Sequence, residues 1–439
     1  MYKSAQYIIG SFLMIVLSCK TASKNAVSTM QNMPANKNDS LPVPYATSSS
    51  TNFSNVIGWK NNQKPTAPVG FTVTKYADGF QNPRWMYRLP NGDLLVAEAN
   101  TEHGFLEKVG AVVIGANKSN DMRKSANRIT LLRDTDEDGK PEIRTTFLKD
   151  LNLPLGMLLL NNNFYVANTD GLWMYPYQKG ATSITAAGKK ILDLPAGKHN
   201  RHWTRNIITN AKGTKIYIAI GSGSNVAEDG LENEKDRARI WEINPDGSGL
   251  KVYASGIRNP VGMGWAPGTN TLWTSVNERD ELGDELVPDY LTSVKEGGFY
   301  GWPFSYYGQH VDPRIKKEEL DSSLVQKAIV PDMSLGSHTA SLGLLFYKQK
   351  KFPSKYRNGA FIAQHGSWNK SVLAGYKVIF VPFKEGRPSG KAEDFLTGFI
   401  VDPAKDEVHG RPVGLATLAD GSLLVTDDTS DVIWKVSAD

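Results

Sequence analysis

Apolar and polar positions along this chain repeat in units that each predict a pair of short β-strands. A turn containing Pro or Gly leads into an apolar run, a hairpin containing Gly follows, and a second apolar run ends in a polar loop. The unit recurs at 82–97, 153–167, 204–219, 259–274, 341–363 and 411–426. About six such units, spaced unevenly by roughly 50 to 80 residues, predict an all-β fold, a six-bladed β-propeller with insertions.

Helical periodicity is nearly absent outside one segment. Residues 312–327 are the best short helix candidate, with Asp312 as its cap and Pro313 at the first helical position. Because the blades of a propeller pack radially around a channel, the loops that lead into the innermost strands gather on one face. We therefore expect the residues just ahead of these strands to converge there and to carry the chemistry.

The first 64 residues differ in composition from the rest of the chain. Lys3 precedes an apolar run at 8–17, which is too short to span a bilayer comfortably and is typical of a signal peptide. The run ends in Val16-Leu17-Ser18-Cys19, which resembles a bacterial lipobox; an ordinary secretory signal with a chance cysteine is the alternative.

These features divide the chain into three parts. We predict a signal peptide at 1–18, a lipidated flexible tether at 19–64 that is poor in apolar residues, and a folded domain at 65–439. The protein would then be exported and held to a membrane only by its lipid anchor, facing the periplasm or the cell surface.

The charge of the chain argues against a nucleic-acid partner. The formal net charge is +5 over 439 residues, and basic residues are interleaved with acidic ones without forming a stripe. Neither zinc-finger spacing nor an aromatic-basic platform accompanies them. A solvated surface accounts for this pattern.

His202 lies just ahead of a predicted inner strand, in the run His199-Asn200-Arg201-His202. A neutral imidazole there can act as a general base toward an alcohol, because its pKa lies near working pH. The glycine-containing loop at 221–225 permits close approach of the backbone to a ligand. A hydrogen-bonded structural histidine is the plain alternative, and the position ahead of the strand favours the catalytic role.

Three cations occupy comparable positions in other units: Arg258, Arg411 and Lys370. Arginine matches a carboxylate with paired donors, so convergent cations indicate a ligand with several carboxylates. Each of them alone would more commonly cap a local turn or pair with an acid. His338 and His365 mark further channel-facing turns, where they would help to hold a ligand or pack at the rim.

The run from Asp134 to Glu142 has acidic residues at its first, third, fifth and ninth positions and a glycine after the third acid. The side chains of Asp134, Asp136, Asp138 and Glu142, with the carbonyl of Lys140, would surround a hard cation with oxygen. An EF-hand needs Glu where this chain has Thr145, so we predict a calcium-binding β-hairpin loop with a structural role. A solvated acidic turn is the alternative.

Four motifs in the order found here resemble a known family. They are Arg258-Asn259-Pro260, Gly298-Phe299-Tyr300-Gly301-Trp302-Pro303, His365-Gly366-Ser367-Trp368-Asn369 and Gly410-Arg411-Pro412-Val413-Gly414. From about Asn82 to its end the chain resembles the soluble pyrroloquinoline quinone (PQQ)-dependent sugar dehydrogenases, with most likeness to the L-sorbosone and pyranose dehydrogenase branch. The resemblance implies a six-bladed propeller that holds PQQ on one face, with calcium bridging the quinone and the protein.

The resemblance also implies roles for individual residues. His202 corresponds to the family's general base, and Arg258 with Asn259 to a pair that contacts the cofactor. Arg411 corresponds to an arginine that binds a PQQ carboxylate, and Lys370 to a cofactor-binding lysine. Two successive backbone carbonyls of a Gly-Pro pair hold the calcium in better-known members, and Arg279-Asp280 takes that place here.

The activity implied is oxidation of an aldose or a related, sorbosone-like sugar. His202 would remove the proton of a hydroxyl group or an aldehyde hydrate while hydride leaves for the quinone. Calcium would polarise the quinone oxygen, and Arg258 would stabilise the charge that develops. An external acceptor, a cytochrome or a quinone, would then receive the electrons.

Two other functions stay open at the level of the sequence. A calcium-dependent propeller lactonase would use a channel calcium with Asn and Asp or Glu ligands and no cofactor, although nearby cations would weaken such a metal. A non-catalytic carbohydrate-binding lipoprotein would need neither a base nor paired cations.

Overall fold

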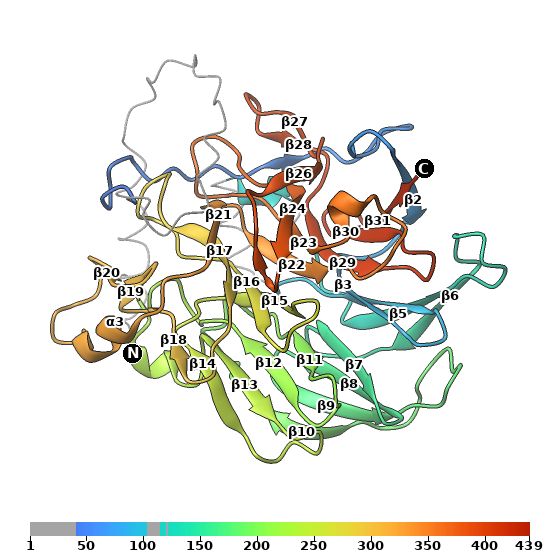
Figure 1. Ribbon diagram of the computed structural model, residues 1–439, viewed down its shortest axis with the longest axis horizontal. Helices are drawn as coiled ribbons and strands as arrows, with labels where there is room; N and C mark the ends of the chain where they lie inside the picture. Colours follow the sequence, from blue (N-terminus) through green and yellow to red (C-terminus); the bar gives the residue numbers. More distant parts are fainter. Residues whose placement is uncertain (1–40, 103–114, 120–121) are drawn as a thin grey trace, which may run out of the picture. The chain divides into compact units, whose positions relative to one another are not determined.

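The computed structural model describes residues 41–102, 115–119 and 122–439. In this part of the chain the fold is all-β, as predicted. Consecutive strands pair into six sheets of four or more strands, accompanied by two smaller sheets (Figure 1). The only α-helix among the described residues is α3 (Ser322–Lys327).

The six larger sheets follow one another along the chain. The first two contain β3 (Pro83–Arg88), β4 (Leu94–Glu98), β5 (Arg128–Arg133) and β6 (Ile143–Leu148), then β7 (Gly156–Leu160), β8 (Asn163–Asn168), β9 (Gly171–Pro176) and β10 (Lys189–Asp193). The third contains β11 (Ile207–Thr209), β12 (Ile216–Ile220), β13 (Arg239–Ile243), β14 (Lys251–Ser255) and β18 (Gly298–Phe299). The fourth contains β15 (Pro260–Trp265), β16 (Leu272–Val276), β17 (Pro288–Ser293) and β21 (Met333–Ser337).

The last two large sheets close the fold. The fifth contains β22 (Ser341–Phe346), β23 (Gly359–Gln364), β24 (Lys377–Lys384), β25 (Arg387–Pro388) and β26 (Glu393–Leu396). The sixth joins the two ends of the described domain, because β2 (Phe71–Ala77) pairs with β31 (Val432–Ala438) beside β30 (Leu423–Asp427) and β29 (Pro412–Thr417). Such pairing ties an early strand to the last three through backbone hydrogen bonds.

The second strand of each unit lies in the core, which explains its apolar sequence. β4, β12, β16, β23 and β30 are buried at every position. A strand covered on both faces is a continuous apolar run instead of an alternation, as in Leu94-Leu95-Val96-Ala97. Clusters of buried side chains fill the space between neighbouring sheets, for example between the fifth and sixth sheets around Phe361, Phe380 and Trp434.

The first strands of the six sheets form a closed ring. β3 contacts β7, and contacts continue in order through β11, β15, β22 and β29 back to β3. The segments that lead into these strands therefore meet on one side of the ring, as expected from the repeat.

Two of the sequence predictions need correction. Residues 41–64, assigned to the tether, belong to the folded domain: β1 (Asn55–Val56) pairs with β28 (Glu407–Val408), which pairs with β27 (Ile400–Asp402). The indole Nε1 of Trp59 donates to Asp427 Oδ2 at 2.7 Å. A few aromatic and polar side chains anchor this segment despite its low apolar content.

The predicted helix at 312–327 is wrong in its first half. The helix begins only at Ser322, and the side chain of Asp321 caps it by accepting from two backbone N–H groups. Asp312 is fully buried and pairs instead with Arg279 and Arg314. The small sheet of β19 (Ser305–Tyr306) and β20 (His310–Val311) precedes it.

The predicted signal peptide at 1–18, the lipidated Cys19 and the tether up to residue 40 lie outside the described residues. Among the residues that are described, none of the helices is long and apolar enough to cross a membrane.

If residues 41–64 are part of the fold, Trp59→Ala should destabilise the protein. Trp59 stacks on His409 at 4.3 Å and packs edge-on against Phe399 and Trp434. Removing a large, packed side chain typically costs about 3 kcal/mol, which should lower the midpoint of urea unfolding clearly. Val43→Ala, at a side chain that is 71% exposed, is the matched control and should change nothing. Equal midpoints for both variants would mean that the segment is a loose tether after all.

Candidate functional site

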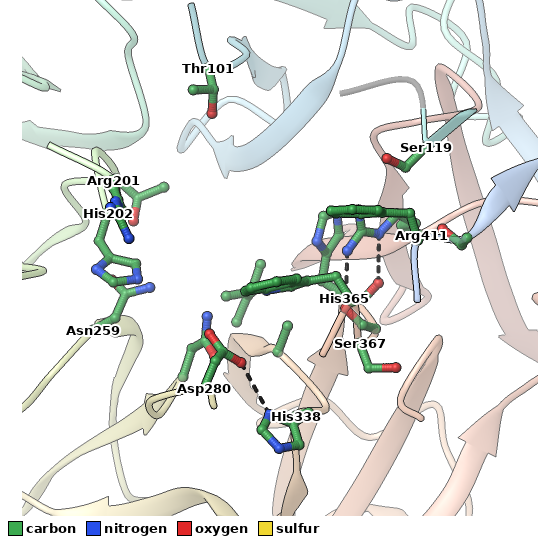
Figure 2. Close-up of a pocket in the computed structure, with 18 of the residues that line it drawn as sticks. Thr101, Ser119, Arg201, His202, Asn259, Asp280, His338, His365, Ser367 and Arg411 are labelled. Carbon is green, nitrogen blue, oxygen red and sulfur yellow. Dashed lines mark hydrogen bonds and ion pairs between the residues drawn. The ribbon is translucent and has the colours of Figure 1, made fainter. Parts of the chain in front are cut away.

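A cavity of about 480 Å³ opens where the segments leading into the inner strands meet. It is lined by residues at the start of, or up to three positions ahead of, the inner strands of five different sheets: Arg84, Thr204, Asn259, Ala340 and Arg411. The convergence predicted from the repeat is therefore confirmed. Figure 2 shows His202 and Asn259 on one side of the cavity and His365 and Arg411 on the other.

His202 lines the cavity and is held in one tautomer. Its Nδ1 lies 3.0 Å from the carbonyl oxygen of Ser222 and 2.9 Å from Ser222 Oγ. Ser222 Oγ donates its own hydrogen to the carbonyl of Ser224, so both neighbours of Nδ1 act as acceptors. Nδ1 must carry the hydrogen, which leaves the lone pair on Nε2.

The electrostatic surroundings keep this imidazole neutral. Burial lowers the pKa of His202 well below its usual value, and the positive charge of Arg258 lowers it further. A neutral ring with a free Nε2 lone pair is the form that a general base needs.

Asn259 lies beside His202, and a glycine makes this closeness possible. A Cβ at Gly221 would come within 2.5 Å of both Asn259 Oδ1 and the Cβ of His202. Only a residue without a side chain fits between the two groups. The glycine-containing loop predicted to approach a ligand therefore packs directly against the candidate base.

Several buried polar atoms at the cavity wall have no hydrogen-bond partner. They are Ser54 Oγ, Arg84 Nε, Thr204 Oγ1 and Asn259 Oδ1. Buried polar groups are satisfied in the great majority of cases, so a cluster of orphans around one cavity indicates a polar ligand. The charged residues among the described lining are Arg84, Arg201, Arg411 and one carboxylate, Asp280, which favours an anionic ligand.

Arg411 and His365 form the opposite wall as one network. The guanidinium of Arg411 donates from Nε to the carbonyl of His365 and from NH2 to that of Gly366, both at 3.0 Å. His365 Nε2 lies 2.9 Å from Asp428 Oδ1, and Arg84 also pairs with this carboxylate. Burial would raise the pKa of Asp428, but the charges of His365 and Arg84 outweigh it and hold the pKa below its usual value.

Arg258 is not among the described residues that line the cavity, and the cofactor contact predicted for it stays a prediction. Its side chain is buried and donates to the carbonyls of Asn225, Asn277 and Glu278 and to Asn225 Oδ1. Its remaining N–H faces Asp280 Oδ2 at 3.6 Å. With all its donors engaged, Arg258 acts behind the cavity, where it holds the loop and keeps His202 neutral.

The carbonyls of Arg279 and Asp280 do not fit the predicted calcium site. The carbonyl of Asp280 accepts from Arg314 NH1 at 2.7 Å and from Asn225 Nδ2 at 3.2 Å, and the carbonyl of Arg279 accepts from Val287 N. A guanidinium already satisfies the oxygen that the metal would need, and its charge would repel a divalent cation.

The Asp280 carboxylate faces the cavity, and a neighbouring histidine balances its negative charge. His338 lies 3.1 Å from Asp280 Oδ1 through Nδ1 and 2.9 Å from the carbonyl of Gly283 through Nε2 (Figure 2). Burial disfavours the charged imidazole, but the ion pair with Asp280 outweighs it and raises the pKa of His338. Asp280 is therefore an anchored acceptor at the cavity wall and not a spare metal ligand.

Lys370 is also directed away from the cavity. Its Nζ donates to the carbonyl of Asp284 at 2.6 Å and pairs with Glu285 at 3.1 Å, and it is absent from the described lining. The role predicted for Lys370 in holding a cofactor stays a prediction, and in this structure these two acceptors engage its charge. Its neighbours Ser367 and Trp368 do line the cavity.

The acidic hairpin between β5 and β6 is separate from this cavity. One ligand atom each from Asp134, Asp136, Asp138 and Glu142 lies within 4.8 Å of the others, as the spacing predicts. Backbone N–H groups of the loop already bond some of these oxygens, for instance Gly139 N to Asp134 Oδ2 at 2.7 Å. Asp134 Oδ1 is buried without a partner.

Arg84 and Asp428 are site residues that the sequence prediction missed. Arg84 follows Asn82-Pro83 at the first inner strand, the same turn that drew attention to Arg258 and Asn259, so the repeat held a usable signal. Asp428 follows β30 directly, at a strand end like the others. Asp280 was predicted through its carbonyl, whereas its carboxylate is the part that faces the cavity.

Comparison with known proteins gives two family matches, each over part of the chain. Residues 178–367 match the profile of the family described as glucose/sorbosone dehydrogenase, and residues 305–439 match the profile described as TrAA12-like. An uncharacterized protein of Borreliella burgdorferi is 30% identical over 308 residues, which are 66% of this chain and 77% of that protein.

A pyranose dehydrogenase that depends on pyrroloquinoline quinone, from Coprinopsis cinerea, is 29% identical over 324 residues. That alignment covers 61% of this chain but only 43% of the fungal enzyme. The holo form of the PQQ domain of the Coprinopsis enzyme superposes with a TM-score of 0.67 at 18% identity, covering 88% of this chain and all of that domain. A Trichoderma reesei enzyme of carbohydrate-active family AA12 gives 0.70 at 17% identity, covering 87% of this chain and all of that one. These structural likenesses establish a shared fold.

Proposed function

Because the chain belongs to the glucose/sorbosone dehydrogenase family, we propose that it is a PQQ-dependent dehydrogenase that oxidises an aldose or a related, sorbosone-like sugar. The observation that carries this proposal is the cavity itself. A neutral histidine with a free Nε2 faces a wall of arginines and unpartnered buried polar atoms. A base opposite an anion-binding wall suits hydride transfer from an alcohol to an anionic redox group.

The fold proposed for this enzyme is a six-bladed propeller in which each of the six large sheets is one blade. The closed ring of first strands supports this count, and so does the sixth sheet, in which β2 pairs with the last strand, β31. The cavity then lies at one end of the central channel, the usual place for a propeller site.

The residues present fit PQQ, a planar group with several carboxylates. Arg411 and Arg84 would bind its carboxylates, since guanidinium groups pair with carboxylates through parallel hydrogen bonds. Asn259 would bring its unpartnered side chain to the quinone end, beside His202. A bound quinone would supply the acceptor for a hydride and its two electrons.

His202 then moves the proton. Nε2 accepts the hydroxyl proton of the sugar, or of its aldehyde hydrate, as the C–H hydrogen departs. The ring becomes a cation for that interval, and the two acceptors of Ser222 at Nδ1 stabilise it. Arg258 has the opposite effect, so it returns the imidazole to its neutral form before the next turnover.

The reduced enzyme needs an external electron acceptor. We propose that this acceptor is a cytochrome or a quinone. Export and lipidation at Cys19 remain predictions from the sequence. They would place the enzyme outside the cytoplasm, where membrane electron carriers are accessible.

Reconstitution tests the proposed function directly. Purified protein incubated with PQQ should reduce a redox dye when sugars are added, and His202→Ala should keep PQQ but lose about 10²- to 10⁴-fold in kcat, as expected for a missing general base. Because the pKa of His202 lies well below its ordinary value of 6.5, the wild-type rate should persist as pH falls through 6.5 and decline only at lower pH.

His310→Ala is the matched control for that experiment. His310 is exposed on β20, outside the described cavity lining, and its loss should leave kcat unchanged. Hydrolysis of a lactone without PQQ would replace the proposal with a lactonase. Near-normal turnover by His202→Ala would remove this residue as the base.

Arg411→Ala should weaken PQQ binding selectively. Losing hydrogen bonds from a charged donor to a carboxylate should raise the Kd for PQQ about ten- to a hundred-fold, measured by absorbance titration of the apoprotein. Lys370→Ala should leave that Kd unchanged, because Lys370 lies outside the described cavity lining. A larger loss in Lys370→Ala than in Arg411→Ala would reverse the two assignments.

We also propose that the acidic hairpin binds calcium as a structural ion. Carboxylates gathered within 4.8 Å and the unpartnered Asp134 Oδ1 support it. The cavity itself needs no calcium in this proposal, because the Asp280 carbonyl is already bonded by Arg314.

Calcium at the hairpin should therefore raise thermal stability. A ligand that binds only the folded state stabilises by about 2.7 kcal/mol at a hundred times its Kd, so Tm should rise by several degrees over the protein in EGTA. The double variant Asp136→Asn/Asp138→Asn should lose this shift, and Asp150→Asn, an exposed acid elsewhere, should retain it. A Tm that is the same with and without calcium contradicts the proposed site.

A further inference from the structure

Residues 41–59, which we call the N-terminal strap, cross the loops that surround the cavity. Backbone N–H groups connect Tyr45 to the carbonyl of Leu282, Asn52 to that of Trp368, and Asn55 to that of Asp406. Thr47 Oγ1 and Ser49 Oγ accept from the backbone of Asp284 and Gly283. The strap thus binds the loops that follow β16, β23 and β27.

The strap contributes an aromatic ring to the cavity. Phe53 and Trp368 both line it, with ring centroids 5.9 Å apart and planes inclined by only 12°. This spacing lies within the range of offset-stacked aromatic pairs. The hydrogen bond from Asn52 N to the Trp368 carbonyl, at 2.7 Å, fixes the neighbouring backbones and so sets the position of the two rings.

The aromatic pair and the anion-binding wall lie at different depths. Trp368 is 37% exposed, whereas Arg411 is 6% exposed and Asn259 only 4%. At the rim of a cavity, an aromatic side chain this open, stacked beside a second ring, offers an apolar contact surface to a ligand. The buried Arg411, with Arg84 whose side chain is 12% exposed, suits a resident anionic group, and the more exposed Trp368 suits a ligand that exchanges.

Polar groups of the same cavity complete the chemistry of a sugar site. Asp280, Asn277 and Thr101 line the same cavity and offer acceptors and donors for hydroxyl groups. A pyranose ring has one apolar C–H face and an edge of hydroxyls, so it requires an apolar plane with polar groups around it.

We propose that Phe53 and Trp368 form a platform that binds the apolar face of the sugar substrate, so that the N-terminal strap is part of the substrate site. This inference rests on the proposed function and deepens it, because it assigns the sugar to the rim and leaves the arginine wall to the cofactor. The strap matters to catalysis by presenting Phe53, and Asn52 is its positioning residue.

Substitutions at the two rings test the platform. In the PQQ-loaded enzyme, Phe53→Ala and Trp368→Ala should each raise the KM for D-glucose, D-mannose or D-xylose about ten-fold with little change in kcat, since a stacked aromatic contact is commonly worth a factor of that order. The Kd for PQQ, from absorbance titration, should stay within about two-fold of wild type if the rings bind the sugar alone.

Three further variants make the result specific. Phe53→Leu keeps an apolar side chain of similar size and a folded strap but removes the ring, so it should also weaken sugar binding. Phe53→Tyr keeps an aromatic ring and should bind the sugar as the wild type does. Tyr45→Ala, on the same strap but with a side chain that is 55% exposed and outside the described cavity lining, should behave as wild type.

Sugar binding to the apoprotein separates this inference from the proposed function. Saturation-transfer NMR should detect D-glucose, D-mannose or D-xylose on wild-type apoprotein, with weaker signals on Phe53→Leu and Trp368→Ala. If sugars bind through the rings but PQQ supports no dye reduction, the proposed function fails and the platform stands. The platform is overturned if none of these sugars binds, if KM is unchanged in both ring variants, or if those variants lose PQQ affinity instead.

Discussion

The site depends on how one buried cation, Arg258, is bonded. Every N–H of its guanidinium group faces a protein oxygen, and these oxygens belong to the segments around Asn225 and Asn277 to Asp280. A charge buried this deeply is tolerated only when it is paired and hydrogen-bonded, so the loops must keep this geometry. The same charge penalises protonation of His202. One group therefore shapes the wall of the cavity and holds its base in the neutral form.

The Gly298-to-Pro303 motif belongs to this support. Trp302 is buried, and its Nε1 donates to the carbonyl of Asn225 at 3.0 Å, the same oxygen that Arg258 Nε uses. Asn225 in turn bonds the backbone of Asp280 on both sides, through Oδ1 to the N–H and through Nδ2 to the carbonyl. This motif, one of the four that carry the family resemblance, thus acts one layer behind the cavity wall.

The sequence predicted the position of the site better than it predicted the partners of the charged side chains. The repeat identifies the segments ahead of the inner strands, and His202, Asn259 and Arg411 line the cavity as expected. Arg258 and Lys370 occupy equivalent sequence positions but turn toward acceptors on other loops, and no local pattern reports that direction. Those acceptors come from separate segments, and pairing across such distances is decided by tertiary packing. The strap escaped prediction for a related reason, since composition averages conceal single anchors such as Phe53 and Trp59.

The charges around the cavity also bear on the choice between a redox enzyme and a calcium-dependent lactonase, which the sequence left open. A channel calcium would have to sit near Asp280, where Arg258, His338 and Arg314 already contribute positive charge at hydrogen-bonding or ion-pair distance. A divalent cation there would oppose the charges of two arginines, Arg258 and Arg314, whereas an anionic ligand gains from the arginines on the opposite wall. The arrangement therefore favours a bound polyanion over a bare metal, and it favours a redox enzyme over a metal-dependent hydrolase. In this cavity the positive charge that a metal would bring to a ligand is already supplied by side chains of the chain itself.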